Sequence, residues 1–333
     1  MGYTLEDIAR MAGVSRSTVS RVLNNHPNVR PEVRERVWEV IHQVGYQPHA
    51  AARSLATNRS NVIGLIIPEA VSTLFADPFF SVVIRGITDA CYQHNYFLML
   101  ALFNNPSQGH ELLRRLLHSH SVDGIIVAST RLDDPLVEHL LAGKVPFVCI
   151  GRHPDPRVSY VDADNVTGAR MAVEYLLRKG HTRVATITGP LNMAVGQDRL
   201  EGYRQALRGR HMTVDEALIV EGDFTEQAGM AAMRQLLALD EPPTAVFAAS
   251  DAMAIGALKV IREAGLRVPE DITVVGFDDL PQVAYMDPPL TTVRQPIGRL
   301  GETAVHLLLD AITYGAERPQ RVVLPVELVA RGT

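Results

Sequence analysis

Charged and aromatic side chains recur directly after apolar runs in the larger, carboxyl-terminal part of the chain. Arg152 follows VCIG, Asp278 and Asp279 end VVGFDD, and Phe79 and Phe80 stand in DPFFS. Guanidinium and carboxylate groups form paired hydrogen bonds, and aromatic rings supply apolar contact area. These residue types together predict the binding of a polyhydroxylated or heteroaromatic small molecule.

The complete set of candidate binding residues shares this position, at or shortly after the end of an apolar run. The set is Phe79, Phe80, Ser129, Arg152, Asn192, Arg199, Phe224, Ser250 and Asp278. Each has a structural alternative. The phenylalanines could belong to the core, Ser250 and Asp251 could cap the helix that follows them, and Arg199 and Asp278 could pair with each other as a bridge.

Catalytic and metal-binding patterns are absent from the sequence. No G-x-x-x-x-G-K-[ST], H-E-x-x-H, C-x-x-C or G-x-S-x-G pattern occurs, and the twelve histidines show no metal-ligand spacing. The carboxylates of FDD could take part in acid–base chemistry, but a glycosidase needs an opposed pair of carboxylates across its substrate. The sequence therefore predicts that the protein is not an enzyme and needs no cofactor or metal ion.

The stretch TLEDIARMAGVSRSTVSRVL near the amino terminus carries a different chemistry. Thr4 and Ser15 are suited to cap two short helices, and Gly13 is placed to end the first of them. In the second helix Val19 and Val22 share one face, while polar residues including Arg16 and Arg21 share the other. Two short helices joined by a tight turn predict a helix-turn-helix, whose second helix can enter the major groove of DNA.

Arg16 stands in the first turn of the second helix, where the helix dipole makes a cation mildly unfavourable. Contacts with guanine or phosphate would offset that cost, since a good bidentate base contact contributes about 1–3 kcal/mol. The alternative is a solvated helix face that carries two arginines by chance.

A third helix is predicted from Pro31 to Gly45, with Trp38 packed on the three-helix core or against the rest of the protein. The segment after it, residues 46–60, is rich in alanine and too short to form a stable helix alone. It could become helical on DNA and insert Leu55 into the minor groove, or it could be a plain linker.

Charge is unevenly distributed along the 333 residues, whose net charge is −5. Residues 1–59 carry eight arginines and five acids, which gives +3 and leaves −8 for the remainder. This distribution suggests that only the head meets a polyanion. Two cysteines in apolar runs, no signal-peptide pattern and no run of about 20 apolar residues predict a cytoplasmic protein that does not enter the membrane.

Apolar runs alternate with amphipathic helical stretches from Val62 onward, as in parallel α/β sheets. The predicted fold is an all-α helix-turn-helix head and an α/β body of two Rossmann-like lobes with three crossovers, near Asp162, Thr291 and Val323. The predicted boundaries are 1–46 for the head, 47–60 for the hinge helix and linker, and 61–333 for the body. Within the body, lobe 1 takes about 61–161 and 292–322, and lobe 2 takes 162–291 and 323–333.

The head resembles the lactose-repressor (LacI/GalR) family of bacterial transcription regulators. It carries the patterns T-x-x-D-I-A, A-G-V-S-x-x-T-V-S-R-V-L-N and G-Y-x-P-x-x-x-A-R-x-L. The resemblance implies three groups of DNA contacts. Bases would be read by Arg16, Ser17 and Arg21, phosphates held by Thr4, Ser15, Thr18, Ser20 and Asn24, and the minor groove entered by Ala52 and Leu55. His49 departs from the asparagine usual in the family, which leaves that hinge contact open.

The resemblance also implies a periplasmic-binding-protein type of body that binds an effector between its lobes. Phe80, Ser129, Arg152, Arg199, Phe224, Ser250 and Asp278 match effector-contacting positions. The family further implies a repressor that binds a pseudo-palindromic operator in double-stranded DNA as a homodimer, and no heptad-patterned tail for tetramers follows the last predicted strand. The implied effector is a sugar or sugar phosphate rather than a purine or nucleoside. The competing interpretations are a solute-binding module of a transport system, which the basic head disfavours, and an enzyme.

Overall fold

The computed structural model describes residues 3–23, 26–46, 59–68, 77–102, 114–116, 121–128, 131–132, 135–143, 145–316 and 318–333. The chain forms two compact units, Met1–Ser60 and Asn61–Thr333. Five residues singled out from the sequence lie outside the described residues: Asn24, His49, Ala52, Leu55 and Ser129. Among the described residues no helix is long and apolar enough to cross a membrane.

The described residues of the first unit form the helices α1 (Leu5–Met11), α2 (Arg16–Leu23) and α3 (Pro31–Val44). The predicted caps are present. Thr4 Oγ1 accepts a hydrogen bond from the Asp7 backbone N–H, and Asp7 Oδ2 accepts one from the Thr4 N–H, 3.0 Å away, which completes a capping box. Ser15 Oγ accepts from the Thr18 N–H at 3.2 Å and so caps α2.

The core of the first unit forms where the apolar faces of its three helices meet. Ile8, Val19, Val37 and Ile41 are buried there. Trp38 is 38% exposed and its ring lies beside His42, so of the two alternatives packing on this core is wrong, and packing against the rest of the protein stays a prediction. Consecutive helical residues point about 100° apart, and α3 directs Val37 inward, which turns Trp38 toward the surface.

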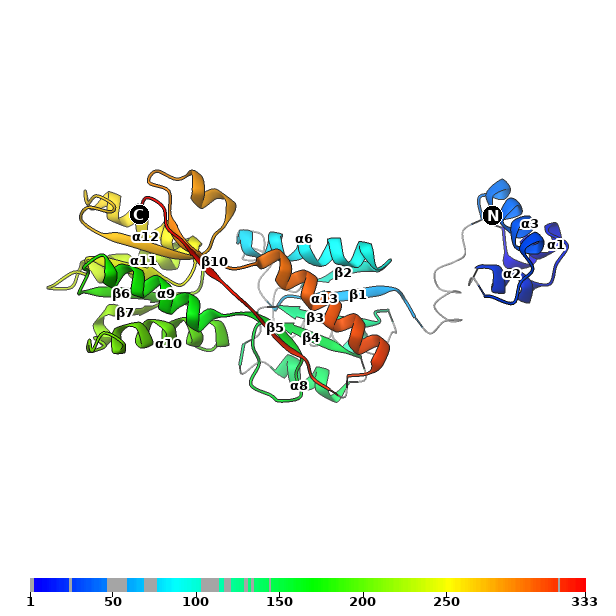
Figure 1. Cartoon of the computed structure of the whole chain (residues 1–333), viewed down its shortest axis with the longest axis horizontal. Helices are drawn as coiled ribbons and strands as arrows, with labels where there is room; N and C mark the ends of the chain where they lie inside the picture. The colour runs from blue at the N-terminus through cyan, green and yellow to red at the C-terminus, as the bar shows by residue number, and fades with distance from the viewer. Residues whose placement is uncertain are drawn as a thin grey trace. The chain divides into compact units, whose positions relative to one another are not determined.

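Lobe 1 of the second unit is a fully parallel six-stranded sheet covered by helices (Figure 1). Its strands are ordered β11-β5-β4-β3-β1-β2, with bounds β1 Val62–Ile66, β2 Phe97–Ala101, β3 Gly124–Ala128, β4 Phe147–Ile150, β5 Tyr160–Ala163 and β11 Arg321–Leu324. The helices described with their bounds in this lobe include α6 (Pro78–Gln93), α8 (Pro135–Ala142) and α13 (Ile297–Tyr314), and α6 packs on α13. Every residue of β3 is buried, as expected for a parallel strand covered on both faces.

Lobe 2 is a second six-stranded sheet, ordered β12-β10-β9-β8-β6-β7, in which only the β10–β12 pair is antiparallel. The strands are β6 Val184–Thr188, β7 Ile219–Glu221, β8 Ala245–Ala248, β9 Thr273–Asp278, β10 Thr291–Arg294 and β12 Glu327–Val329. The helices are α9 (Asn165–Arg178), α10 (Ala194–Arg208), α11 (Glu226–Leu237) and α12 (Asp251–Glu263), with short 3-10 helices η1 (Glu216–Leu218) and η2 (Pro281–Tyr285). Helix α9 packs on α10, and α11 packs on α12.

The chain passes between the two sheets three times, after β5, after β10 and after β11. The second crossing comes slightly later than the sequence suggested. Strand β10 pairs with β9, with Val293 opposite Phe277, so the chain returns to lobe 1 only after Arg294 and not at about residue 292. The third crossing follows Leu324, two residues beyond the expected end of lobe 1. Apolar strands of both sheets look alike in sequence, so their partners decide these boundaries.

Candidate functional site

A cavity of about 650 Å³ lies between the two lobes and is lined by residues of both. Much of its wall follows the carboxyl ends of parallel strands, where open α/β sheets bind ligands. Eight of the nine candidate binding residues line it, namely Phe79, Phe80, Arg152, Asn192, Arg199, Phe224, Ser250 and Asp278. The ninth, Ser129, lies outside the described residues. The cavity brings the eight residues together, and their contact with a ligand stays a prediction.

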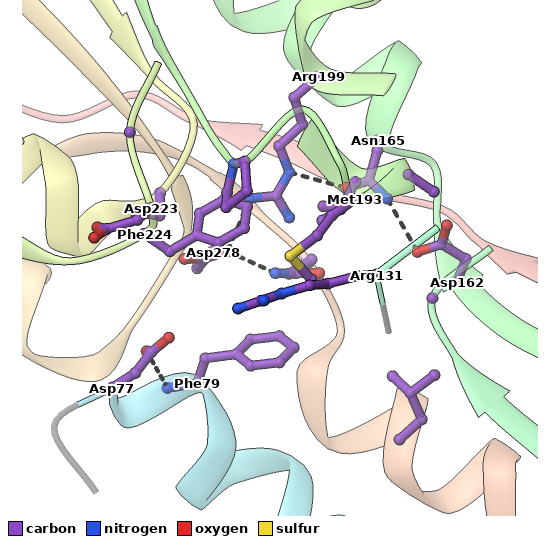
Figure 2. A pocket seen from close by; sticks show the side chains of 18 of the residues that line it. Asp77, Phe79, Arg131, Asp162, Asn165, Met193, Arg199, Asp223, Phe224 and Asp278 are labelled. Atoms are coloured by element: carbon purple, nitrogen blue, oxygen red, sulfur yellow. Dashed lines mark hydrogen bonds and ion pairs between the residues drawn. The ribbon is translucent and has the colours of Figure 1, made fainter. Parts of the chain in front are cut away.

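Arg199 of α10 lies at the centre of the lobe 2 wall (Figure 2). Its side chain is buried, and its Nε donates to Asn165 Oδ1 at 2.9 Å while an Nη donates to the Ala249 carbonyl. The guanidinium carbon lies 3.7 Å from the centre of the Phe277 ring, and Nη1 lies 3.6 Å from Asp278 Oδ1. The expected structural bridge between Arg199 and Asp278 is therefore present, and both residues face the cavity.

Asp278 ends β9 with a backbone φ of 125°, a region that side-chain-bearing residues rarely adopt. Its Oδ1 accepts from Gln295 Nε2 at 2.6 Å. Burial raises the pKa of the Asp278 carboxyl to about 7, against the opposing effect of the Arg199 guanidinium. Strained backbone of this kind clusters at ligand sites, and it fits a carboxylate held ready for a ligand.

Asp162 near the end of β5 and Asn165 at the start of α9 complete the polar wall, and neither belongs to the set of candidate binding residues. Asp162 Oδ1 accepts from Asn165 Nδ2 at 3.0 Å, and burial raises the pKa of Asp162 to about 6. Asn165 thus joins Asp162 to Arg199, as the dashed lines in Figure 2 show. Asp164 caps α9, since its side chain accepts from the Thr167 N–H, whereas Asn165, the first residue of α9, forms the bridge. The signal was available, because both residues stand where the chain leaves β5 for lobe 2.

Aromatic rings line the cavity from both lobes. Phe79 and Phe80 begin α6 of lobe 1, with their ring centres 5.4 Å apart in an edge-to-face arrangement. Asp77, a further lining residue absent from the sequence prediction, caps this helix by accepting from the Phe79 N–H at 2.9 Å. Phe224 of lobe 2 lies against Gly189, where any Cβ would collide with its ring. Glycine at that position is what lets the ring reach the cavity wall.

Ser250 is a helix cap, and its contact with a ligand stays a prediction. It lines the cavity, and its Oγ accepts from the Met253 N–H at 3.2 Å to cap α12. Asp251 is buried away from the lining and accepts hydrogen bonds from the Leu280 N–H and the Thr292 hydroxyl. Asp251 is therefore a structural residue of lobe 2.

The guanidinium of Arg152, a lobe 1 residue, is already paired with a carboxylate of lobe 2. Its Nε and Nη2 donate to the two carboxylate oxygens of Asp198 on α10, at 2.9 and 2.7 Å. Arg131, a further lining residue that the sequence did not suggest, extends between Phe79 and Arg199 in Figure 2. Among the described residues no group of histidine, cysteine or carboxylate side chains is placed to hold a metal ion.

In the first unit the described candidates for DNA contact form a polar surface on and beside α2. Ser15, Arg16, Ser17 and Arg21 are exposed, as is Thr4 at the start of α1. Val19 and Val22 are buried behind them. Thr18 and Ser20 are half-buried, and Ser15 Oγ lies within hydrogen-bond distance of the hydroxyls of Ser17 and Thr18. A free helix face of this composition suits base edges and phosphates, and the contacts themselves stay predictions.

Arg16 is not free on this surface. Its Nε lies 3.1 Å from Glu6 Oε1 on α1, and both side chains are more than half exposed. Arg21 has no ion-pair partner among the described residues. Glu6 therefore offsets part of the unfavourable position of Arg16 at the positive end of α2.

A helix-turn-helix unit together with a two-lobed, cleft-containing α/β unit defines a class of protein, the transcription regulators built on a periplasmic-binding-protein body. Residues 4–49 match the family model for bacterial regulatory proteins of the lacI family, and residues 173–333 match the periplasmic binding protein-like domain. The chain is 43% identical over 331 residues to the HTH-type transcriptional regulator CelR of Thermobifida fusca. The aligned region covers 98% of this chain and 97% of that relative. It belongs to the LacI family.

Further comparisons agree on fold and class. The ribose operon repressor of Escherichia coli strain K12 is 37% identical over 332 residues, 99% of either chain. A solved complex of the regulator CelR with cellobiose has a TM-score of 0.79 at 41% identity and covers 99% of both chains. The lac repressor dimer bound to operator and an anti-inducer has a TM-score of 0.87 at 30% identity, covering 100% of this chain and 99% of that one. These relatives are regulators of transcription and not enzymes.

Proposed function

We propose that the protein is a repressor that binds a pseudo-palindromic operator as a homodimer and releases or retains it in response to a neutral sugar. The head would comprise residues 1–46, with residues 47–60 as hinge. The observation that carries this proposal is the cavity between the lobes, where a buried Arg199–Asp278 pair and three phenylalanines meet in a LacI-family chain.

The chemistry of the cavity favours a sugar as the ligand. Carboxylates that accept hydrogen bonds, guanidinium groups that donate them, and aromatic rings that stack on C–H faces match a polyhydroxylated ring. Relatives support the same class, since CelR has been solved with cellobiose and the ribose operon repressor is named for a sugar operon.

The charge of the lining favours a neutral sugar over a sugar phosphate. Five lining residues carry carboxylates and three carry guanidinium groups: Asp77, Asp162, Glu221, Asp223 and Asp278 against Arg131, Arg152 and Arg199. Two of the three guanidinium groups already have protein partners, Asp198 for Arg152 and Asn165, Ala249 and Asp278 for Arg199. A phosphate dianion would therefore meet a net negative wall with only Arg131 lacking an ion-pair partner among the described residues.

The ligand class is tested by thermal unfolding of the full chain with cellobiose, ribose, glucose 6-phosphate and adenosine. A ligand that binds only the folded state, present at 100 times its Kd, stabilises the protein by about 2.7 kcal/mol. The expected result is an upward shift with a neutral sugar and none with the phosphate or the nucleoside. A shift with glucose 6-phosphate alone would contradict the charge argument.

Operator binding is tested by unbiased selection of duplexes by the full chain, followed by measurement of the stoichiometry on the selected site. A two-fold symmetric protein reads two half-sites, so the selected duplexes should contain an inverted repeat bound by two chains. Selection of no preferred sequence would overturn the proposal and leave a cleft-bearing receptor.

The proposed link between the two sites is a population shift. A sugar that binds one arrangement of the lobes more tightly favours that arrangement in the dimer, and only this differential affinity can change operator binding.

A further inference from the structure

The Arg152–Asp198 ion pair joins the two lobes at the cavity. Arg152 belongs to lobe 1, in the loop that follows β4, and Asp198 belongs to lobe 2, in the second turn of α10. Two hydrogen bonds of 2.9 and 2.7 Å connect the guanidinium fork to both carboxylate oxygens. This bidentate geometry is the strongest that an arginine and a carboxylate can form.

Both partners are held in place by their own lobes. The Arg152 backbone N–H donates to Asp162 Oδ2 at 3.0 Å, which fixes the loop to the end of β5. Asp198 precedes the buried Arg199 on α10, and its side chain is only 17% exposed. A second bond between the lobes, from the Leu132 N–H to the Asn192 carbonyl at 2.8 Å, adds to the same closure.

Asp198 also limits how Arg152 can meet a ligand. The Nε–Nη2 edge of its guanidinium is taken by Asp198, which leaves the Nη1–Nη2 end. A ligand that claimed this edge would have to break two charge-assisted bonds and leave a largely buried carboxylate unpaired.

We infer that Asp198 is a positioning residue that holds Arg152 from the opposite lobe. This ion pair, the Arg152–Asp198 clasp, favours the arrangement in which the lobes enclose the cavity. Arg152 then acts on the ligand through lobe closure, with its Nε–Nη2 edge held by Asp198. The role of the ion pair in lobe closure rests on the geometry alone, whereas its effect on the ligand rests on the proposed sugar-binding function.

The clasp is tested by measuring the distance between the lobes with spin labels on the full chain without ligand. Labels are attached at Glu138→Cys on α8 and Gln205→Cys on α10, two exposed positions on helices that lie along the lower edge of the unit in Figure 1. The native Cys91 and Cys149 are buried, and burial raises their pKa to about 11 and about 12, so they resist labelling.

Asp198→Asn removes the charge and keeps the shape, so the expected result is a longer and broader distribution of distances. Arg152→Lys keeps the charge but loses the fork, and should give a distribution between the two. The matched control is Glu216→Gln, which removes the pairing of another α10 residue, Arg204, inside lobe 2. This control should leave the distribution unchanged.

An Asp198→Asn distribution identical to that of the unchanged protein would overturn the clasp. A second arm titrates the same variants with cellobiose. If closure couples to binding, Asp198→Asn should weaken the affinity on the order of 5- to 150-fold although Arg152 is intact. Unaltered affinity would overturn the action through closure. Failure of the unchanged protein to bind cellobiose would count against the proposed ligand class only, because the distance measurement needs no ligand.

Discussion

Arg16 in the first unit and Arg199 in the second are the same residue type in opposite environments, one exposed and one buried. The Arg16 side chain is 69% exposed and pairs with a single exposed carboxylate, that of Glu6. The Arg199 side chain is 5% exposed and is held by Asn165, the Ala249 carbonyl and Asp278.

This contrast indicates where binding and stability can be separated. An exposed ion pair contributes about 0–1 kcal/mol, so Arg16 can exchange Glu6 for a base or phosphate at small cost. A buried guanidinium that loses its carboxylate is left uncompensated. We therefore expect the polar surface of α2 to be altered with little effect on folding, whereas changes at the cavity should affect binding and folding together.

Ionic strength should separate the two sites most strongly. A regulator that neutralises about 6–10 phosphates loses roughly 10³–10⁵ in operator affinity between about 50 and 200 mM salt. Affinity for a neutral sugar should barely change over the same range, because no charge is gained on binding. Fluorescence anisotropy on the operator and calorimetry with the sugar measure the two. Equal losses of operator affinity and sugar affinity with rising salt would contradict this difference between the two sites.

Asp278→Ala should have the next largest effect, and it should weaken both the stability of the fold and ligand binding. Removal of the carboxylate leaves Arg199 without its buried anion, which lowers the free energy of unfolding by about 3–5 kcal/mol. The ligand-induced thermal shift should disappear, while operator binding without ligand persists. Urea denaturation gives the stability. The control is Glu263→Ala, which removes an exposed pair with Arg234 and should change stability far less.

Arg16→Ala should lower operator affinity by about 1–3 kcal/mol and relax the preference at one base position in each half-site. Binding to unrelated duplexes should fall much less, and the melting of the first unit should stay nearly constant. Arg10→Ala serves as the control, since Arg10 is another exposed, ion-paired arginine and lies on α1. Equal losses on specific and unrelated duplexes would show that Arg16 only contacts phosphate.

Lowering the pH should weaken ligand binding at the cavity by a smaller amount. Burial raises the pKa of Asp278 to about 7, so its ionised, hydrogen-bond-accepting form falls about tenfold for each pH unit below that value. Stability should respond in the opposite direction. Because the folded-state pKa exceeds the unfolded one, the stabilisation linked to this group is full below about pH 4 and is lost as the pH rises to 7. Titrations of Asp278→Asn should lose the part of the pH dependence of binding near pH 7 and keep any part that is due to Asp162, whose pKa is raised to about 6.

The features that were predicted correctly from the sequence are those that depend on the local pattern of residues. Helix caps at Thr4 and Ser15 follow from residue type and spacing, and the cavity positions of Arg199 and Asp278 follow from the rule that ligands meet strand ends. The capping of α12 by Ser250 is equally local.

What the sequence could not supply depends on partners that are distant along the chain. Asp198 stands 46 positions from Arg152, and no local pattern marks the two as a pair. Asn165 has the right chemistry for a cap, and only the arrival of Arg199 turns it into a bridge. The crossing predicted near Thr291 lies a few residues before the end of β10 for the same reason, since an apolar run does not indicate which strand it pairs with.

The antiparallel pairing of β10 with β12 has a mechanical consequence for the second unit. The second crossing leaves β10 and the third arrives at β12, and Arg294 ties the two strands further by donating to Glu327 as well as to Asp279, each at 2.6 Å. On the lobe 1 side the first and third crossings are neighbours too, because β5 pairs with β11 and the Asp164 N–H donates to the Leu324 carbonyl at 2.9 Å. The three connections are thus joined to one another, so we expect the lobes to rotate about them rather than to slide past each other.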